Sequence, residues 1–362
     1  MKICFIAPAN NYHTKKWANW FLSRGHEIHI ISFIKDEIPG VSVHYIETGV
    51  SAEGSDASKL KYLFKARKLK KIIDSIQPDV VNVHYASSYG AVAALSGIKH
   101  YVLSVWGSDI YDFPRKSPLH RLLLKYSLKK AEILFSTSHS MAAEAAKYTN
   151  REFEITPFGV DMDLFNPNKR TREKDIPFTI GIVKTLSDLY GIDYLIKAVA
   201  ILKKEKHDFE IALRISGDGP QEEKYRKQVK DLGIENITTF LGRITQEKAA
   251  CEWANMDVAV IPSMLYESFG VSAVEAQACG TPLIITDVEG LMETTTPGVS
   301  SELVSKKDEQ AIADAIVKLY NNPDLRRRMG EEGRNNVVNK YELDKCFKRI
   351  ENYFEHFIQI GD

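Results

Sequence analysis

Short runs of apolar residues alternate with longer segments of helical periodicity along the chain. Apolar runs bounded by turn residues indicate strands that are buried on both faces of a parallel sheet. In the first half, strands are predicted at residues 2–7, 27–33, 41–46, 79–84, 101–106, 132–138 and 152–160. Helices are predicted between several of them, at residues 14–24, 58–76, 88–96, 118–130 and 139–147. This alternation favours a doubly wound α/β domain.

The second half repeats the same rhythm after a polar linker, NPNKRTREKDIP, at residues 166–177. Strands are predicted at residues 178–183, 209–216, 237–242, 258–263 and 282–286. Helices are predicted near residues 191–204, 220–232, 246–254, 270–279 and 308–320. We therefore expect two Rossmann-like domains, residues 1–165 and 166–341, facing each other across a cleft. A last helical pattern, in about 342–362, can pack on either domain.

Composition is that of a globular protein, with 44% hydrophobic and 27% charged residues in 362. No apolar run approaches the roughly 20 residues needed to span a bilayer. The first apolar run ends at a Pro and two Asn, so it is read as a buried strand and not as a signal peptide, and a cytoplasmic location is expected. The four cysteines are scattered, and we expect them to be reduced.

Charge is distributed unevenly although the whole chain is neutral. Residues 1–165 carry 21 Lys and Arg against 16 Asp and Glu, a net charge of +5 that the remainder balances. Lys59–Lys71 is basic and free of acids, and residues 115–130 form a second basic amphipathic patch. The first run has an apolar stripe of Leu60, Leu63, Phe64, Leu69, Ile72 and Ile73. It is read either as a packed helix with a solvated basic face or as a helix attracted to anionic lipid, by about 1 kcal/mol per basic residue. No nucleic acid partner is expected.

Two carboxylates stand in a segment that otherwise has the composition of a core, YESFGVSAVEAQACGTPLII. Glu275 shares the apolar stripe of a short predicted helix, where an unpaired carboxylate is costly. Glu267 precedes that helix, and Ser268–Val271 supplies N–H groups at its start, a ready site for phosphate. The pair can be an acid/base couple of the glycosidase kind. It can also consist of two ligand-binding acids, or of a solvated acid and an acid paired with a base.

The usual nucleotide-binding signatures are missing from the sequence, since neither G-x-G-x-x-G after the first strand nor a P-loop is present. In open α/β sheets, ligands bind beyond the carboxyl ends of the strands. Lys184 directly follows a predicted strand, and Asn10 and Asn11 lie in the loop after the first predicted strand. These positions are therefore candidates for contact with a ligand.

Several motifs, taken together and in order, resemble one known family. They are RGHEIHIIS (24–32), WGSD (106–109), PFGVDMDLFNP (157–167), SGDGP (216–220), FLGRI (240–244), ANMDVAVIPS (254–263), ESFGVSAVE (267–275) and EAQACGTPLIITDVEGLMET (275–294). The chain is thereby identified as similar to the retaining glycosyltransferases of family 4 (glycosyl transferases group 1), which have the GT-B fold. The resemblance implies sugar transfer from a nucleotide diphosphate sugar, with retained configuration and without a metal or other cofactor. The D-x-D in residues 161–163 lies near the linker and is not expected to bind a metal.

The resemblance also implies roles for individual residues. The group assigned to catalysis is Lys184, Glu267, Asp109 and His13. The group assigned to the donor is Glu275, Ser268, Phe269, Gly270, Val271, Gly217, Gly219 and Arg243. The group assigned to the acceptor is Asn10, Asn11 and His84. Within these groups Lys184 would hold the donor diphosphate, Glu267 the sugar hydroxyls and Glu275 the ribose.

The sequence departs from the family pattern at several positions and leaves alternatives open. Lys184 stands where the family usually has an arginine, Tyr190 where it usually has a lysine as second cation, and Trp106 where it often has a histidine. The loop with Asn10 and Asn11 is commonly glycine-rich in the family. Asp109 either replaces that histidine or caps the next turn. His13 either touches the acceptor or caps its helix, and His84 is either an acceptor residue or a core histidine.

The function that we expect is hexosyl transfer, most simply from a UDP-sugar, to a hydroxyl of a surface glycan or of a lipid-linked saccharide. The partners are then the donor, the acceptor and an anionic membrane surface, at which the protein would be peripheral. A nucleotide-sugar epimerase of the same fold and a non-catalytic sugar-nucleotide-binding subunit are the alternatives.

Overall fold

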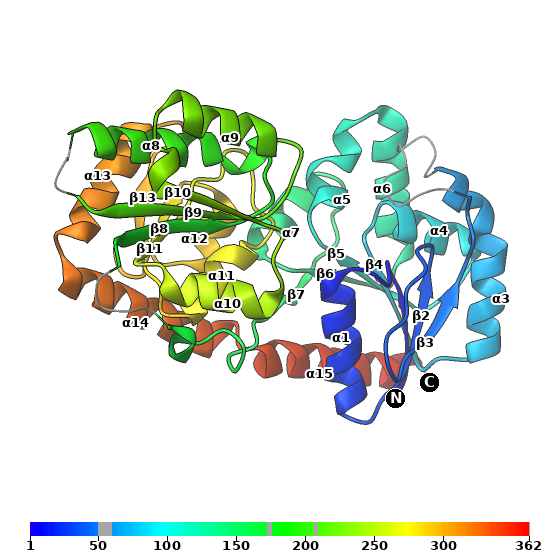
Figure 1. Cartoon of the computed structure of the whole chain (residues 1–362). Helices are drawn as coiled ribbons and strands as arrows, with labels where there is room; N and C mark the ends of the chain where they lie inside the picture. The colour runs from blue at the N-terminus through cyan, green and yellow to red at the C-terminus, as the bar shows by residue number, and fades with distance from the viewer. Residues whose placement is uncertain (50–59, 172–175, 206–208, 362) are drawn as a thin grey trace. The chain divides into compact units, whose positions relative to one another are not determined.

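The computed structural model describes residues 1–49, 60–171, 176–205 and 209–361. The chain divides into two compact units, labelled in Figure 1 by their strands and helices. Unit 1 comprises Met1–Phe158 together with Cys346 and the residues after it, and unit 2 comprises Gly159–Lys345. The division therefore lies slightly before the predicted boundary at residues 165 and 166.

Unit 1 is built on a parallel sheet of seven strands in the order β3-β2-β1-β4-β5-β6-β7. The strands are β1 (Lys2–Ile6), β2 (Glu27–Ser32), β3 (Ser42–Tyr45), β4 (Val80–His84), β5 (Val102–Val105), β6 (Ile133–Ser136) and β7 (Glu154–Ile155). β1 and β4 lie next to each other at its centre, and β4 is buried at every position, as expected for a strand covered on both faces. Each of the seven predicted strands is present.

Helices cover both faces of this sheet (Figure 1). They are α1 (Tyr12–Ser23), α3 (Ala66–Ile76), α4 (Ser88–Ser96), α5 (Ser108–Tyr111), α6 (Pro118–Lys130), α7 (His139–Ala145) and α15 (Leu343–Gly361). α4 packs against α3 and α6 on one face. α15 packs against α1, where Phe347 meets Trp17 with ring centroids 5.2 Å apart. Glu351 of α15 also binds His26, at 2.7 Å, so the last helix belongs mainly to unit 1.

The predicted helix at residues 58–76 is wrong in its first part. Residues 58 and 59 lie outside the described residues, η1 (Leu60–Lys65) is a 3₁₀ segment, and α3 begins at Ala66. A 3₁₀ segment has about three residues per turn and not 3.6, so its side chains do not continue the stripe of the following helix. Tyr62 is consequently buried, whereas Phe64, expected within the packed stripe, is 87% exposed.

Unit 2 is built on a second parallel sheet, with the strand order β10-β9-β8-β11-β12-β13. The strands are β8 (Phe178–Val183), β9 (Ile211–Ser216), β10 (Thr238–Gly242), β11 (Val258–Ile261), β12 (Leu283–Thr286) and β13 (Ser301–Val304). β13 was not predicted, because its sequence, SELV, is short and half polar. It pairs with β12 through four residues at the edge of the sheet.

The helices of unit 2 also lie on both faces of their sheet (Figure 1). They are α8 (Ile192–Glu205), α9 (Glu222–Asp231), α10 (Gln246–Asn255), α11 (Val271–Ala278), α12 (Glu289–Thr294), α13 (Glu309–Tyr320) and α14 (Pro323–Lys340). The sequence did not predict α14, because its buried residues are only Met329, Gly330, Gly333 and Val337. Two glycines give no hydrophobic signal, yet they allow α14 to approach α11 closely.

Candidate functional site

The predicted donor residues of unit 2 gather where four parallel strands end. Lys184 follows β8, Gly217 follows β9 and Arg243 follows β10, while Glu267 lies in the loop after β11. The loops are joined by backbone hydrogen bonds, since the Lys184 N–H donates to the Ser216 carbonyl at 2.9 Å and the Gly217 N–H to the Gly242 carbonyl at 2.8 Å. The carboxyl edge of this sheet is therefore the candidate site.

An ion pair between Lys184 and Glu267 forms the centre of the site. Lys184 Nζ lies 2.6 Å from Glu267 Oε1, and the two side chains are 10% and 7% exposed. Burial alone would lower the pKa of Lys184, but the charge and hydrogen bond of Glu267, together with Tyr190 and Glu275, outweigh burial and raise the pKa above its ordinary value. The Ser263 hydroxyl also donates to Glu267 Oε1, at 2.8 Å. The lysine is therefore a permanent cation at this edge.

Tyr190 covers the same ammonium group. Lys184 Nζ lies 4.3 Å from the centroid of the Tyr190 ring, within the range of a cation–π contact. Tyr190 ends η4 (Asp188–Tyr190), and Gly191 next to it has φ +62°. A Cβ at Gly191 would lie 2.1 Å from the Pro262 carbonyl, so this loop packs directly on the end of β11. The residue at the position of the family's usual second cation thus contacts the first cation, Lys184.

Close approach of the backbone fixes the loop that carries Lys184. A Cβ at Gly217, which has φ +132°, would lie 1.9 Å from the Lys184 carbonyl. A Cβ at Gly219 would lie 2.4 Å from the Leu186 carbonyl. These glycines, predicted as donor residues from the SGDGP motif, are positions where a larger residue would displace the loop.

The start of α11 is tied to the end of β8. The Ser272 hydroxyl donates to the Val183 carbonyl at 3.0 Å, beside Lys184. Gly270 is the N-cap, with φ +77°. Phe269 is 1% exposed, so only its backbone is available to a ligand. The first turn of a helix presents backbone N–H groups and the positive end of the helix dipole. This turn and Lys184 thus place N–H donors and a cation side by side, an arrangement that is chemically suited to an anion.

Glu275 lies one turn into α11 and is 8% exposed. Its Oε2 accepts a hydrogen bond from Trp253 Nε1 at 3.3 Å. Trp253, in α10, was not predicted as a site residue. It is indicated by its fully buried indole N–H next to Glu275, a contact that the structure shows and the sequence does not. Arg243, in contrast, is exposed. A dedicated acid/base couple is not supported, since Glu267 is bound to a lysine and Glu275 to an indole.

In unit 1, Asp109 is a capping residue. It is 1% exposed, and its carboxylate accepts from the N–H groups of Ala86 and Gly107, both at 2.8 Å, and of Trp106, at 3.2 Å. Burial raises the pKa of Asp109, and these donors oppose the rise without cancelling it. The assignment of Asp109 to catalysis is therefore corrected to the alternative, a carboxylate that caps the turn after β5.

His84 is a core histidine. It is 0% exposed, its Nε2 lies 2.7 Å from the Asn82 side-chain oxygen, and its ring centroid lies 4.2 Å from that of Trp106. Burial lowers the pKa of His84 to about 3. Its assignment to the acceptor is corrected accordingly. Trp106, at the position where the family often has a histidine, is 5% exposed and part of the same aromatic cluster.

The loop after β1 keeps its candidate residues at the carboxyl edge of the first sheet. Asn11 caps α1, since its side-chain oxygen accepts from the N–H groups of His13, at 2.8 Å, and of Thr14, at 3.3 Å. His13 is therefore not the cap, and its ring stacks on Phe158 at 4.0 Å. Burial, helped by Lys16 and His84, lowers the pKa of His13 well below its ordinary value. Asn10 is exposed.

Two further observations concern metals and membranes. Within the described ranges, no group of three or more His, Cys, Asp or Glu side chains is arranged to hold a metal ion. Of the helices in the described part of the chain, none combines the length and the apolar character needed to cross a membrane.

Comparison with known proteins finds similarity over both units. The family model for glycosyl transferases group 1 matches residues 166–336, and the model for glycosyl transferase 4-like proteins matches residues 2–138. A D-inositol 3-phosphate glycosyltransferase of Pseudarthrobacter chlorophenolicus is 28% identical over 323 residues, which cover 81% of this chain and 75% of that protein.

Two solved structures show the same fold at low identity. Sucrose-phosphate synthase from Thermosynechococcus elongatus superposes with a TM-score of 0.85 at 19% identity, covering 99% of this chain and 100% of that one. HepE from Anabaena, solved in complex with UDP-glucose, superposes with a TM-score of 0.78 at 18% identity, covering 98% and 100%. The predicted pair of Rossmann-like domains of GT-B type is confirmed. With matches to both units, this chain belongs to the family 4 glycosyltransferases (glycosyl transferases group 1).

Proposed function

We propose that this protein transfers a hexosyl group from a UDP-sugar to a hydroxyl group of a surface glycan or lipid-linked saccharide, with retention of anomeric configuration. The observation that carries the proposal is the buried ion pair of Lys184 and Glu267 beside the first turn of α11. A buried cation next to a helix N-terminus is suited to a diphosphate.

The donor diphosphate would compete with Glu267 for Lys184. As the anomeric C–O bond to the diphosphate breaks, negative charge grows on the phosphate oxygens. A fixed ammonium group and oriented N–H groups stabilise that charge more than they stabilise the bound donor. Since its pKa is raised, Lys184 is charged at neutral pH and can act in this way.

The two glutamates would hold the two ends of the donor. Once Lys184 engages the diphosphate, Glu267 can accept hydrogen bonds from sugar hydroxyls, and Ser263 already orients its Oε1. Glu275 would accept from the ribose hydroxyls, with its other oxygen held by Trp253. In this arrangement both acids accept hydrogen bonds from the donor, and neither transfers a proton.

Retention would follow if the acceptor attacks on the face that the diphosphate leaves. The bond between the anomeric carbon and the leaving oxygen breaks, the bond to the acceptor oxygen forms, and the acceptor proton passes to the leaving phosphate. This course needs neither a metal nor a covalent enzyme intermediate. The choice of UDP as the nucleotide is supported by HepE, which has the same fold and was solved with UDP-glucose.

Unit 1 would hold the protein at the cytoplasmic face of an anionic membrane. Phe64 of η1 is 87% exposed, and on α6 Leu119 and Leu122 are 53% and 64% exposed. η1 and α6 both pack against α4. The exposed bases on η1, on α3, which follows it, and on residues 115–130 are Lys61, Arg67, Lys68, Lys71, Arg115, Lys116, Arg121, Lys125, Lys129 and Lys130. Apolar side chains among bases are suited to a surface of anionic lipid.

The proposal is tested with the full chain, a panel of UDP-, GDP- and ADP-sugars, and glycan and lipid-linked acceptors. We expect a UDP-sugar to give the largest thermal stabilisation, and transfer to give a product whose anomeric configuration, measured by NMR, matches the donor. Transfer should persist in EDTA. A changed sugar in the presence of donor alone would instead identify an epimerase. Binding of UDP without transfer to any acceptor would indicate a non-catalytic subunit.

A further inference from the structure

The turn at the start of α11, Ser268–Val271, is supported by an aromatic contact on its buried side. We call these four residues the α11 turn. Phe269 is 1% exposed, and its ring centroid lies 5.4 Å from that of Tyr341, with the ring planes at 80° to each other. Edge-to-face pairs of this kind stabilise a structure beyond the area that they bury. The Phe269 side chain therefore fixes the position of the turn, while the backbone of the turn is available to a ligand.

Tyr341 also contacts α12, the helix that packs against the α11 turn. Its hydroxyl group donates to the Glu293 carbonyl of α12 at 3.1 Å. A Cβ at Gly270 would lie 3.0 Å from Thr294 Oγ1, so the backbone of the α11 turn lies directly against the same helix. The ring and the hydroxyl group of one side chain, which is 6% exposed, thus hold the turn and its neighbour together.

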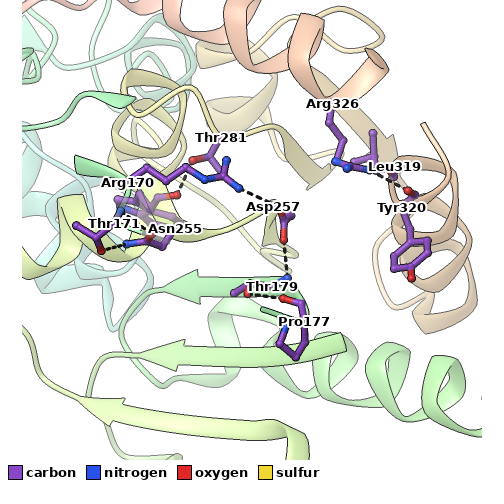
Figure 2. A network of polar contacts seen from close by, with 11 residues as sticks. Arg170, Thr171, Pro177, Thr179, Asn255, Asp257, Thr281, Leu319, Tyr320 and Arg326 are labelled. Atoms are coloured by element: carbon purple, nitrogen blue, oxygen red, sulfur yellow. Dashed lines mark hydrogen bonds and ion pairs between the residues drawn. The ribbon is translucent and has the colours of Figure 1, made fainter. Parts of the chain in front are cut away.

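The helix that ends at Tyr341 is anchored along its length. Tyr341 is the C-cap of α14. Near the start of α14, Arg326 Nη1 donates to the Tyr320 carbonyl of α13 at 2.9 Å (Figure 2). Further along, Asn336 Nδ2 donates to the Thr294 carbonyl of α12 at 2.9 Å. An anchored helix therefore presents the Tyr341 ring to the α11 turn.

The backbone of the same tyrosine belongs to a short bridge between segments distant in sequence. The Val160 N–H donates to the Tyr341 carbonyl at 2.8 Å, and the Leu343 N–H donates to the Val160 carbonyl at 3.0 Å. Val160 closely follows the passage of the chain from unit 1 into unit 2, and Leu343 closely precedes its return. We call Val160 and Tyr341–Leu343 the crossing bridge. The α11 turn and the crossing bridge are thus joined by Tyr341.

We propose that Tyr341 is a positioning residue of the α11 turn and that a ligand bound at this turn also orders the crossing bridge; this rests on the proposed function, in which the turn binds the donor diphosphate. A bound phosphate holds the N–H groups of the turn in one arrangement. This restricts Phe269 and, through the ring contact, Tyr341. Because the Tyr341 carbonyl accepts the Val160 hydrogen bond, that bond then opens less often.

The test is hydrogen exchange of the full chain, resolved to single amides by mass spectrometry, with and without saturating UDP. In the wild type we expect UDP to slow exchange of the Val160 and Leu343 amides about threefold to tenfold, the range expected for one aromatic contact. Tyr341→Leu removes the ring contact and should abolish this slowing. Tyr341→Phe retains the ring and should still show it, although the bond to Glu293 is lost.

A matched control is Tyr320→Leu, which removes another aromatic contact of unit 2. The Tyr320 ring stacks on that of Phe209 with centroids 3.9 Å apart, near the start of β9. This variant should show the same slowing as the wild type. Calorimetry should in addition show that Tyr341→Leu binds UDP about threefold to tenfold more weakly, and that Tyr341→Phe binds it like the wild type.

The first amides of α11 are the internal reference, because they have no partner within the helix and UDP should protect them directly. Absence of this protection in the wild type would contradict the proposed donor site, and with it the role of Tyr341. Protection of α11 without slowing at Val160, or equal slowing in the wild type and in Tyr341→Leu, would overturn the role of Tyr341 alone. Phe269→Leu removes the same contact from the other side. If Tyr341→Leu does not fold, slowing that persists in Phe269→Leu overturns the proposal, and its loss supports it.

Discussion

Lys184 Nζ lies 2.6 Å from Glu267 Oε1 at the carboxyl edge of the second sheet, and the two side chains are nearly inaccessible to water. Burying an ion pair costs desolvation that its attraction only partly offsets, so such a pair is weak evidence for a stabilising role. In the proposed function, the pair keeps a cation charged in a place where a diphosphate would displace its carboxylate partner. This relationship underlies most of the predictions below.

Removing one partner of the pair should destabilise the protein more than removing both. Lys184→Met leaves Glu267 buried without its counter-ion, and we expect it to lower the free energy of unfolding by roughly 3–5 kcal/mol. Adding Glu267→Gln should restore most of that loss. Urea denaturation of the wild type, both single variants and the double variant measures the coupling. Additive effects of the two substitutions would show that the pair does not contribute as a unit.

Tyr190 should support the donor through its ring and not through its hydroxyl group. Tyr190→Leu removes the contact with Lys184, and we expect UDP binding to weaken by about threefold to tenfold, corresponding to roughly 0.7–1.4 kcal/mol for a cation–π contact. Tyr190→Phe should bind UDP like the wild type. Calorimetric titration distinguishes the two variants. Equal weakening in both would mean that the hydroxyl group carries the contribution.

His84 should make folding sensitive to mild acid. Its pKa is lowered from about 6.5 to about 3, so between these values the unfolded chain takes up a proton and the folded chain does not. Above pH 6.5, His84 therefore leaves the free energy of unfolding unchanged. Below pH 6.5 it lowers this free energy as the pH decreases, by about 2 kcal/mol at pH 5. His84→Gln cannot titrate, so its loss of stability between pH 7 and pH 5 should be smaller. The free energy of unfolding is measured by urea denaturation at each pH. An equal decrease between pH 7 and pH 5 in the wild type and in His84→Gln would contradict the prediction.

Membrane binding should depend on exposed apolar side chains of unit 1. Phe64→Ser with Leu122→Ser should weaken binding to vesicles of phosphatidylglycerol and phosphatidylcholine about tenfold, measured by co-sedimentation. High salt should also weaken vesicle binding by the wild type, because it screens the charge of the exposed bases. Leu232→Ser is the matched control, since Leu232 is 42% exposed but lies in unit 2. Equal binding by all variants would exclude this surface as the contact.

The sequence predicted most strands of the two sheets because buried parallel strands, such as the one at residues 258–263, are short and largely apolar runs. It failed for α14, where glycines and not apolar side chains form the packed face. It also failed for Phe64, because a 3₁₀ segment shifts the phase of the stripe, and no local signal in the basic run distinguishes the two helix types.

Within the site, positions could be predicted better than contacts. Lys184 and Glu267 each follow a strand, so both were placed at the right edge, but nothing in the sequence indicates that they bind each other. Asp109 follows a strand and His84 ends one, so the same rule, that residues at the carboxyl ends of strands contact a ligand, assigned both of them incorrectly. Whether such a side chain faces a ligand or the backbone depends on neighbours distant in sequence, such as Ala86 for Asp109 and Trp106 for His84.

The most direct test of the central claim is the affinity for UDP of the Lys184→Met, Glu267→Gln double variant, in which both charges of the ion pair are removed. Lys204→Met, at an exposed lysine of α8, is the control. Calorimetry should show UDP bound by the wild type and by the control with equal affinity, and by the double variant about tenfold more weakly or worse. Equal affinity of all three proteins for UDP would contradict the assignment of Lys184 to the donor diphosphate.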